Sequence, residues 1–179
     1  MNIRLIGGNI LNYLYNDIIG HIPVHFIRLT FLRLLNKKIS ASTKILLHTR
    51  ILNFWQLQTG INVVINQHCL IDCRHYPVII NNNTDIGPYT KIWTLGHDPD
   101  SPTHEVKGGP VNIGHHVWIA SSVTILPNVT ISDGAVIGSA SLIHKDVEKL
   151  SIMAGNPAKK IKTRNNQLLY ELKYNPILE

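Results

Sequence analysis

A single histidine stands immediately before the longest irregular stretch of the chain. His97 precedes the segment DPDSPTHEVKGGPVN, residues 98–112, which interrupts the repeating pattern described below. Imidazole has a pKa near ~6.5, so a histidine at the base of a long inserted loop is a candidate general base. Three carboxylates are candidates to orient its ring, and the sequence does not choose among them: Asp98, Asp100 and Glu105. The neighbouring histidines are expected to be loop or outward-facing residues: His104, His115 and His116.

Polar residues also flank a cysteine in the segment INQHCLID. Asn66 and Asp72 stand on either side of Cys69. An asparagine at such a place ordinarily makes a corner hydrogen bond, and a ligand-binding role is the alternative. Cys69 falls at an inward position and is expected to be a core residue, not a covalent nucleophile. Trp93 is expected to point outward near His97, either as a stacking surface for a ring or as a subunit contact.

The elements that position these residues follow from a sustained period of six. Between residues 113 and 147 isoleucine recurs at every sixth position, and a small or branched residue follows four positions after each one. A helix has a period near 3.6 and an ordinary strand a period of 2. A period of six is typical of a β-helix in which each hexapeptide supplies one short strand and one turn. The isoleucines are Ile113, Ile119, Ile125, Ile131, Ile137 and Ile143.

The same register extends back to Ile39 with three interruptions. Leu57 and Gln58 break it once, Pro77–Ile79 form a small insertion, and residues 98–112 form the long one. Three hexapeptides per coil give about five coils. At an interstrand spacing of ~4.8 Å the stack is expected to be about 24 Å tall. The fold class predicted is an all-β solenoid, a single-stranded parallel β-helix.

Segments outside the register occupy both ends of the chain. Residues 3–37 carry apolar residues at helical spacing, with a break at Gly20 and with Pro23 at an expected first helical position. We expect residues 1–38 to form a helical cap over the open end of the solenoid, or a basic amphipathic surface on an anionic membrane. The β-helix is expected over residues 39–148, and a tail with a short C-terminal helix ended by Pro176 over residues 149–179.

The composition is that of a globular, core-forming protein, because 44% of residues are hydrophobic and 16% are charged. A formal charge of +6 without a dominant basic run indicates either a basic surface or an anionic ligand or membrane, and no nucleic-acid partner is expected. The two cysteines define no disulfide framework. No secretory cleavage pattern or membrane-spanning run is visible, so the expected location is the cytoplasm, with the inner face of the membrane as the alternative.

Two motifs carry a resemblance to a known family. The phrase LGHDPDSP…GGPV…VWI and the segment AGNPAKKI resemble the sugar O-acetyltransferase branch of the hexapeptide-repeat acyltransferases, which includes galactoside and maltose acetyltransferases. The resemblance covers residues 39–164 and is strongest over 92–162. It implies a left-handed coil, a homotrimer with active sites between subunits, and acetyl-CoA as co-substrate without a required metal. The reaction implied is acetyl transfer to a saccharide hydroxyl, in the biosynthesis of surface or capsular polysaccharide.

The resemblance also assigns roles to residues. It makes His97 the base that takes the proton from the attacking hydroxyl. It places an asparagine at the position of Asn66 near the acceptor, and Asp72 and Trp93 are the other candidates to bind the acceptor. It assigns the remaining set to coenzyme A, with the lysines at the phosphates: Trp118, Ala120, Ser121, Ser139, Lys145, Lys159 and Lys162. His144 replaces the small hydroxyl residue that the family has before the first of these lysines, which puts that contact in doubt.

Other functions remain open on the sequence alone. An antibiotic O-acetyltransferase would use the same base and donor groove. A serine acetyltransferase is less favoured, because those enzymes carry a much larger helical N-terminal domain. A zinc carbonic anhydrase shares the solenoid, but no histidine triplet has that family's spacing. A non-catalytic scaffold would use the solenoid only as an interaction surface.

Overall fold

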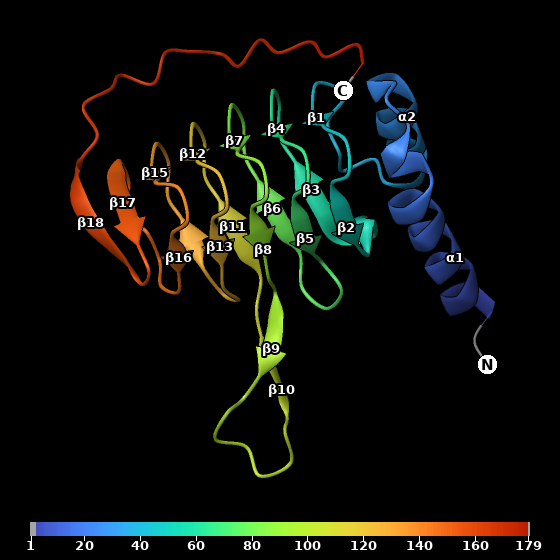
Figure 1. Cartoon of the computed structure of the whole chain (residues 1–179), viewed down its shortest axis with the longest axis horizontal. Helices are drawn as coiled ribbons and strands as arrows, with labels where there is room; N and C mark the ends of the chain where they lie inside the picture. Colours follow the sequence, from blue (N-terminus) through green and yellow to red (C-terminus); the bar gives the residue numbers. More distant parts are fainter. Residues whose placement is uncertain (1–2, 179) are drawn as a thin grey trace.

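The computed structural model describes residues 3–178 and contains three sheets of short parallel strands (Figure 1). The first sheet consists of β1 Lys44–Ile45, β4 Val64–Ile65, β7 Asp85–Ile86, β12 Trp118–Ile119, β15 Val136–Ile137, β17 Ser151–Gly155 and β18 Ala158–Thr163. The second consists of β2 Arg50–Leu52, β5 Leu70–Asp72, β8 Lys91–Ile92, β13 Thr124–Ile125 and β16 Leu142–Ile143. The third consists of β3 Leu57–Thr59, β6 Val78–Ile80, β11 Val111–Ile113 and β14 Thr130–Ile131.

The chain visits the three sheets in the same cyclic order, coil after coil. Each strand pairs in parallel with the strand one coil earlier, and only the terminal β17 and β18 pair antiparallel within these sheets. We call the segments from the first to the second sheet corner one (46–49, 66–69, 87–90, 120–123, 138–141). The segments from the second to the third sheet are corner two (53–56, 73–77, 93–94, 126–129, 144–146). The segments from the third to the first are corner three (40–43, 60–63, 81–84, 114–117, 132–135).

The isoleucines of the repeat form the core, as the period of six predicts. The pairing registers stack them into ladders, such as Ile45, Ile65, Ile86, Ile119 and Ile137 in the first sheet. All five are fully buried. Branched and small residues fill the corners, and buried threonines donate their hydroxyls to the next coil, as Thr84 does to the carbonyl of Gly114 at 2.8 Å.

The three interruptions of the six-residue register have slightly different boundaries from those predicted. The first is the 3₁₀ helix η2, Phe54–Gln56, and Leu57 already belongs to β3. The second is residues 73–77, because β6 begins at Val78. The long one is a β-hairpin instead of a plain loop: β9 Leu95–His97 pairs antiparallel with β10 Val106–Gly108. Residues 111–113 return to the third sheet as β11, so this insertion ends two residues earlier than predicted.

Two helices cover the first coil (Figure 1). They are α1 Ile3–Asp17 and α2 His25–Leu35, with the 3₁₀ helix η1 Ile19–His21 between them. The break at Gly20 is confirmed, whereas α2 begins at His25, two residues after Pro23. Tyr15 and Leu32 are fully buried and join the core of the coil.

Side chains of these helices bind the open backbone edge of the first coil. The Arg28 guanidinium donates to the carbonyl of Ile45 at 3.2 and 3.3 Å, and the Ile45 N–H donates to Nε2 of His25 at 3.2 Å. Asn16 satisfies both the N–H and the carbonyl of Ile51, at 2.8 and 3.0 Å. Because an unpaired strand edge would otherwise recruit another chain, these contacts explain why the solenoid ends here. No helix within residues 3–178 has the length and apolar character needed to cross a bilayer, and membrane contact stays a prediction.

The predicted C-terminal helix is wrong. After β18 the chain runs extended along corner three, back toward α2, as the upper trace in Figure 1 shows. Arg164 Nη1 donates to the carbonyls of His116 and Gly134, and the Tyr170 hydroxyl donates to that of His116. The N–H of Leu172 reaches Oδ1 of Asn83. These anchors lie on successive coils, so an extended chain meets them and a helix would not.

Candidate active site

His97 is carried by the hairpin that leaves corner two after β8. The hairpin projects well away from the coils (Figure 1). Its base is fixed to the solenoid, because the Gly109 N–H donates to the Thr94 carbonyl at 3.0 Å and the Thr94 hydroxyl donates to the Asp72 carbonyl at 2.8 Å. A Cβ at Gly108 would lie 2.2 Å from the Thr94 carbonyl oxygen, so only glycine permits this close approach.

A backbone carbonyl orients the His97 ring. His97 Nδ1 lies 3.0 Å from the carbonyl oxygen of His104, and the two imidazoles stack with centroids 3.8 Å apart and planes 9° apart. A carbonyl can only accept a hydrogen bond, so Nδ1 carries the proton and Nε2 is left with its lone pair. Nε2 is therefore the ring nitrogen that can act as a general base.

The hairpin tip is organised by Ser101, which sequence reasoning missed. Its hydroxyl accepts from the N–H groups of Thr103 and Glu105 at 3.3 and 3.1 Å. Its carbonyl accepts from the N–H of His104 at 3.2 Å. His104 has φ +54°, in the left-handed region. The Asp-Ser-Pro composition of this turn was the available signal.

None of the three candidate carboxylates orients His97. Asp98 instead accepts from Lys107 Nζ at 3.1 Å, and this contact lowers the pKa of the Asp98 carboxyl. Glu105 accepts from the Thr103 hydroxyl, and the N–H of Asp100 donates to Asp98. The prediction of a carboxylate orienter is therefore wrong, because the turn brings a carbonyl to Nδ1 first.

A cavity of about 520 Å³ lies beside His97 at corner two. Trp93 lines it and is half-buried, in agreement with its predicted place near the histidine. Its other lining residues come from the hairpin and from the corners of the next two coils: Leu95, Gly96, Lys107, Gly108, Leu126, Pro127, Asn128 and His144.

A second cavity, of about 300 Å³, shares His144 with the first and is lined by lysine side chains. We call it the cationic cavity. Lys145 and Lys159, both predicted to bind phosphate, line it together with Lys160. Lys160 was missed; its Nζ binds Glu148 at 2.8 Å and lowers the pKa of that carboxyl. Lys162 does not line this cavity, because it pairs with Ile152 further along β18.

Apart from Asp72, the other residues assigned to the donor and acceptor lie on the far side of the second sheet from His97, either at corner one or on the first sheet. Ala120, Ser121 and Ser139 occupy corner one of the last two coils, and the Ala140 N–H donates to the Ser121 carbonyl at 2.9 Å. The Ser121 N–H has no hydrogen-bond partner among the described residues, which leaves it available as a donor. Trp118 is 49% exposed on the outer face of the first sheet.

Asn66 lies at corner one of an earlier coil. Its Nδ2 donates to Asp85 Oδ1 and to the carbonyl of Ile86, both at 3.0 Å. The Asp85 carboxyl is partly buried, and this raises its pKa, while the bond from Asn66 acts in the opposite direction. The amide of Asn66 therefore makes the expected corner hydrogen bonds and still presents Oδ1 as an acceptor.

Asp72 is the fully buried last residue of β5, and it binds Arg74 at the start of corner two. Arg74 Nε and Nη2 lie 2.9 and 3.1 Å from the two carboxylate oxygens. A direct contact of Asp72 with an acceptor would require this pair to separate. The described residues contain no group of three His, Cys, Asp or Glu side chains placed to hold a metal ion.

The fold of this chain is similar to that of solved acetyltransferases. A solved maltose O-acetyltransferase from Clostridium difficile superposes with a TM-score of 0.80 at 26% identity, covering 92% of this chain and 90% of that one. A galactoside acetyltransferase in complex with coenzyme A superposes with a TM-score of 0.78, also at 26% identity, covering 97% and 87%. The resemblance to the sugar O-acetyltransferase branch is thereby confirmed.

Among curated proteins, a chloramphenicol acetyltransferase of Agrobacterium fabrum is 34% identical over 122 residues, 63% of this chain and 58% of the relative. The chain spans 58% of the length of the first curated relatives it matches. No protein-family model matches the chain. The names of these relatives and the bound coenzyme A support an acyltransferase that uses acetyl-CoA.

Proposed function

We propose that the protein is an acetyl-CoA-dependent O-acetyltransferase that acts on a saccharide hydroxyl, built on a left-handed parallel β-helix. The observation that carries the proposal is the fixed tautomer of His97, whose Nδ1–H is bound by the His104 carbonyl at 3.0 Å. A free imidazole would rotate, whereas this contact holds the ring and leaves Nε2 as the nitrogen that can accept a proton. The role in surface or capsular polysaccharide biosynthesis, in the cytoplasm, is part of the proposal.

The reaction follows from the groups present. Nε2 of His97 takes the hydroxyl proton while the hydroxyl oxygen attacks the thioester carbonyl carbon. The unpartnered N–H of Ser121 is suited to stabilise the negative charge that develops on the carbonyl oxygen. The carbon–sulfur bond then breaks, and the coenzyme A thiolate recovers the proton from Nε2. No covalent enzyme intermediate is needed, and the buried Cys69, whose thiol pKa burial raises to about 12, is unsuited to form one.

The active site we propose is shared between subunits of a homotrimer. His97 and the cationic cavity lie at corner two and the end of the coil, whereas Ser121, Ser139 and Asn66 lie at corner one. The second sheet separates the two corners within one chain. A second copy that placed its corner one against the His97 hairpin would bring the two sets together.

The alternative is an antibiotic O-acetyltransferase, which the chloramphenicol acetyltransferase relative favours. An antibiotic O-acetyltransferase would use the same catalytic base and the same acetyl-CoA-binding groups. The two functions therefore differ only in the acceptor that receives the acetyl group. The deciding experiment incubates the protein and acetyl-CoA with a panel of sugars, oligosaccharides and chloramphenicol, and detects product by mass. Transfer to saccharides that requires His97 supports the proposal, transfer to chloramphenicol alone supports the alternative, and transfer to neither rejects both.

A further inference from the structure

A third cavity, of about 680 Å³, lies between α1 and the first coil. Gly8 and Asn12 of α1 line one side, and Asn53, Trp55 and Arg74 of corner two line the other. It shares no lining residue with the cavity beside His97. Nothing in the proposed transfer reaction uses it.

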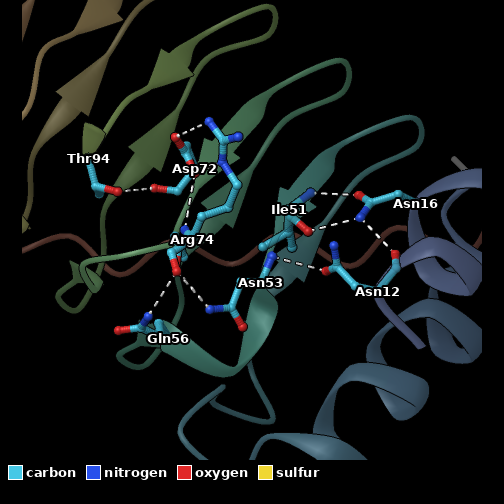
Figure 2. A network of polar contacts seen from close by, with 9 residues as sticks. Asn12, Asn16, Ile51, Asn53, Gln56, Asp72, Arg74 and Thr94 are labelled. Carbon is cyan, nitrogen blue, oxygen red and sulfur yellow. Dashed lines mark hydrogen bonds and ion pairs between the residues drawn. The ribbon is translucent and has the colours of Figure 1, made fainter. Parts of the chain in front are cut away.

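Its walls are fixed by the polar network that Figure 2 shows. Asn12 Oδ1 accepts from the Asn53 N–H at 3.0 Å, which ties α1 to the first coil. Asn53 Nδ2 donates to the carbonyls of Cys73 and Arg74 at 3.2 and 3.3 Å, which ties the first coil to the second. The cavity is therefore built by the fold and does not depend on a mobile loop.

The groups that face this cavity suit a neutral sugar ring. Trp55 stacks on the buried Phe54 with centroids 4.1 Å apart, which holds the indole in place as a half-buried surface. Arg74 uses Nε and Nη2 on Asp72, which leaves Nη1 to donate to a ligand. The Asp72 carboxylate balances the guanidinium charge, so the site does not demand an anion. An aromatic face beside amide and guanidinium donors matches the apolar face and hydroxyl rim of a pyranose.

The cavity lies in line with the one beside His97. Trp55, Arg74 and Trp93 follow β2, β5 and β8, which are adjacent strands of the second sheet. At an interstrand spacing of ~4.8 Å, two coils separate the tryptophans by about 10 Å. The insertion 73–77 spans the gap: Arg74 lines the third cavity, and the Tyr76 ring lies against Gly108, which lines the cavity of His97.

We propose that this third cavity is a subsite for an oligosaccharide acceptor, with one sugar unit on Trp55 and Arg74 while another unit presents its hydroxyl to His97. The inference rests on the proposed saccharide acetyl transfer and names the acceptor as a chain of linked sugars. Corner two would then be the surface along which the chain lies. A monosaccharide would occupy only the cavity of His97.

Gly8 offers a test that leaves the polar network intact. A Cβ at Gly8 would lie at an ordinary contact distance, 3.7 Å, from the Trp55 ring, so the first carbon of a side chain fits there without a clash. Leucine at this helical position would fill the cavity while favouring the helix. Alanine is the matched control, because it changes the backbone preference in the same direction without filling the space. Arg74 is a poor choice, because its removal would leave the buried Asp72 unpaired.

The experiment measures kcat/KM with glucose, maltose and maltotriose and with galactose, galactobiose and galactotriose, and measures trisaccharide binding by calorimetry without acetyl-CoA. In at least one series wild type should prefer the trisaccharide to the monosaccharide by about tenfold, the effect expected of one stacked ring. Gly8→Leu should abolish this preference and weaken trisaccharide binding while leaving the monosaccharide rate unchanged, and Gly8→Ala should retain both.

Failure of the subsite and failure of the proposed function give different results. Acetylation of monosaccharides without any length preference, or a Gly8→Leu variant that keeps the preference or slows all acceptors equally, overturns the subsite and leaves acetyl transfer standing. Trisaccharide binding that depends on residue 8 in a protein that transfers no acetyl group supports the subsite and rejects the proposed function.

Discussion

His97 and His104 stack face to face across the hairpin that leaves the solenoid, and the carbonyl of His104 lies 3.0 Å from Nδ1 of His97. The proton on Nδ1 is thus held by the backbone and not by a carboxylate. Nε2 is therefore the ring nitrogen that can take the proton of an attacking hydroxyl.

Replacement of the base should remove transfer without removing the donor. His97→Ala is expected to lower kcat by ~10²–10⁴, the usual contribution of a general base, and to leave acetyl-CoA affinity in calorimetry nearly unchanged. His104→Asn is the matched control, because asparagine tolerates the left-handed backbone and keeps the carbonyl that binds Nδ1. Retention of more than about a third of wild-type turnover by His97→Ala would exclude it as the base.

The turn that presents the His104 carbonyl depends on Ser101. Ser101→Ala removes the acceptor of two N–H groups, and each hydrogen bond lost from an exposed turn is worth ~0.5–1.5 kcal/mol. We expect kcat to fall roughly 5- to 150-fold while KM for acetyl-CoA stays unchanged. A steady-state comparison with Ser101→Asn, which can rebuild the turn, checks this. Equal loss in both variants would indicate that the turn does not act through hydrogen bonding.

The repeat was predictable because its cause is local and periodic. Every sixth residue must face the core, and the isoleucines of the three sheets are buried in the registers that this period requires. The C-terminal segment was not predictable in the same way. NQLLYELKY has helical spacing, yet its contacts are with single groups on separate coils, such as the His116 carbonyl that binds Tyr170. Only the assembled solenoid presents those groups.

For the site, the sequence located His97, Trp93, Lys145 and Lys159, which line the two adjoining cavities. It could not identify the group that binds Nδ1, because the His104 carbonyl reaches it only through the turn at Ser101. Nor could the sequence show that Lys160, and not Lys162, lines the cationic cavity. These residues are two apart in one strand, and the register shift in the pairing of β17 with β18 between Ile152 and Met153 determines their positions.

The lysines should act on donor affinity alone. A partly exposed lysine–phosphate contact is worth ~1–2 kcal/mol, so Lys159→Ala is expected to raise KM for acetyl-CoA roughly 5- to 30-fold with kcat almost unchanged. Raising the salt concentration should reduce the difference in KM for acetyl-CoA between this variant and wild type. Lys162→Ala should show a smaller effect, because Lys162 lies outside the cationic cavity. If Lys159 contacts the 3′-phosphate, Lys159→Ala should not raise KM for a donor that lacks this phosphate. A fall in kcat with unchanged KM would show that Lys159 does not act on the phosphates.

Stability should fall in mild acid because of His25. Burial, Arg28 and Lys44 lower its pKa from 6.5 to about 4, and its neutral Nε2 accepts from the Ile45 N–H. Between pH 6.5 and about pH 4 the unfolded chain binds a proton at His25 that the folded chain does not. The free energy of unfolding is therefore highest above pH 6.5 and falls as the pH is lowered toward 4. We expect a loss of about 1–3 kcal/mol from this residue. Chemical denaturation of wild type and His25→Gln at both pH values measures it, and identical losses would contradict the assignment.

The last prediction concerns the subunits. If each site takes His97 from one chain and Asn66 from another, two inactive variants should complement each other. His97→Ala and Asn66→Ala are each expected to abolish most transfer, and light scattering should show a trimer for both. Coexpression of the two variants in equal amounts, without selection for mixed oligomers, yields a random mixture of trimers. Random assortment leaves about a quarter of the sites with both wild-type residues, because the two sides of an interface between copies are chosen independently.

The random mixture should therefore recover about a quarter of wild-type activity per site, far above either parent. A site contained within one chain predicts the opposite result, since every subunit would then carry one disabling substitution. The double variant His97→Ala/Asn66→Ala coexpressed with wild type is the control, because it contains the same number of substitutions in a different arrangement. It too leaves about a quarter of shared sites intact, but half of the sites if each lies within one chain. The ratio of the two mixtures thus reports the arrangement independently of expression level, and an active monomer in light scattering would reject the shared site outright.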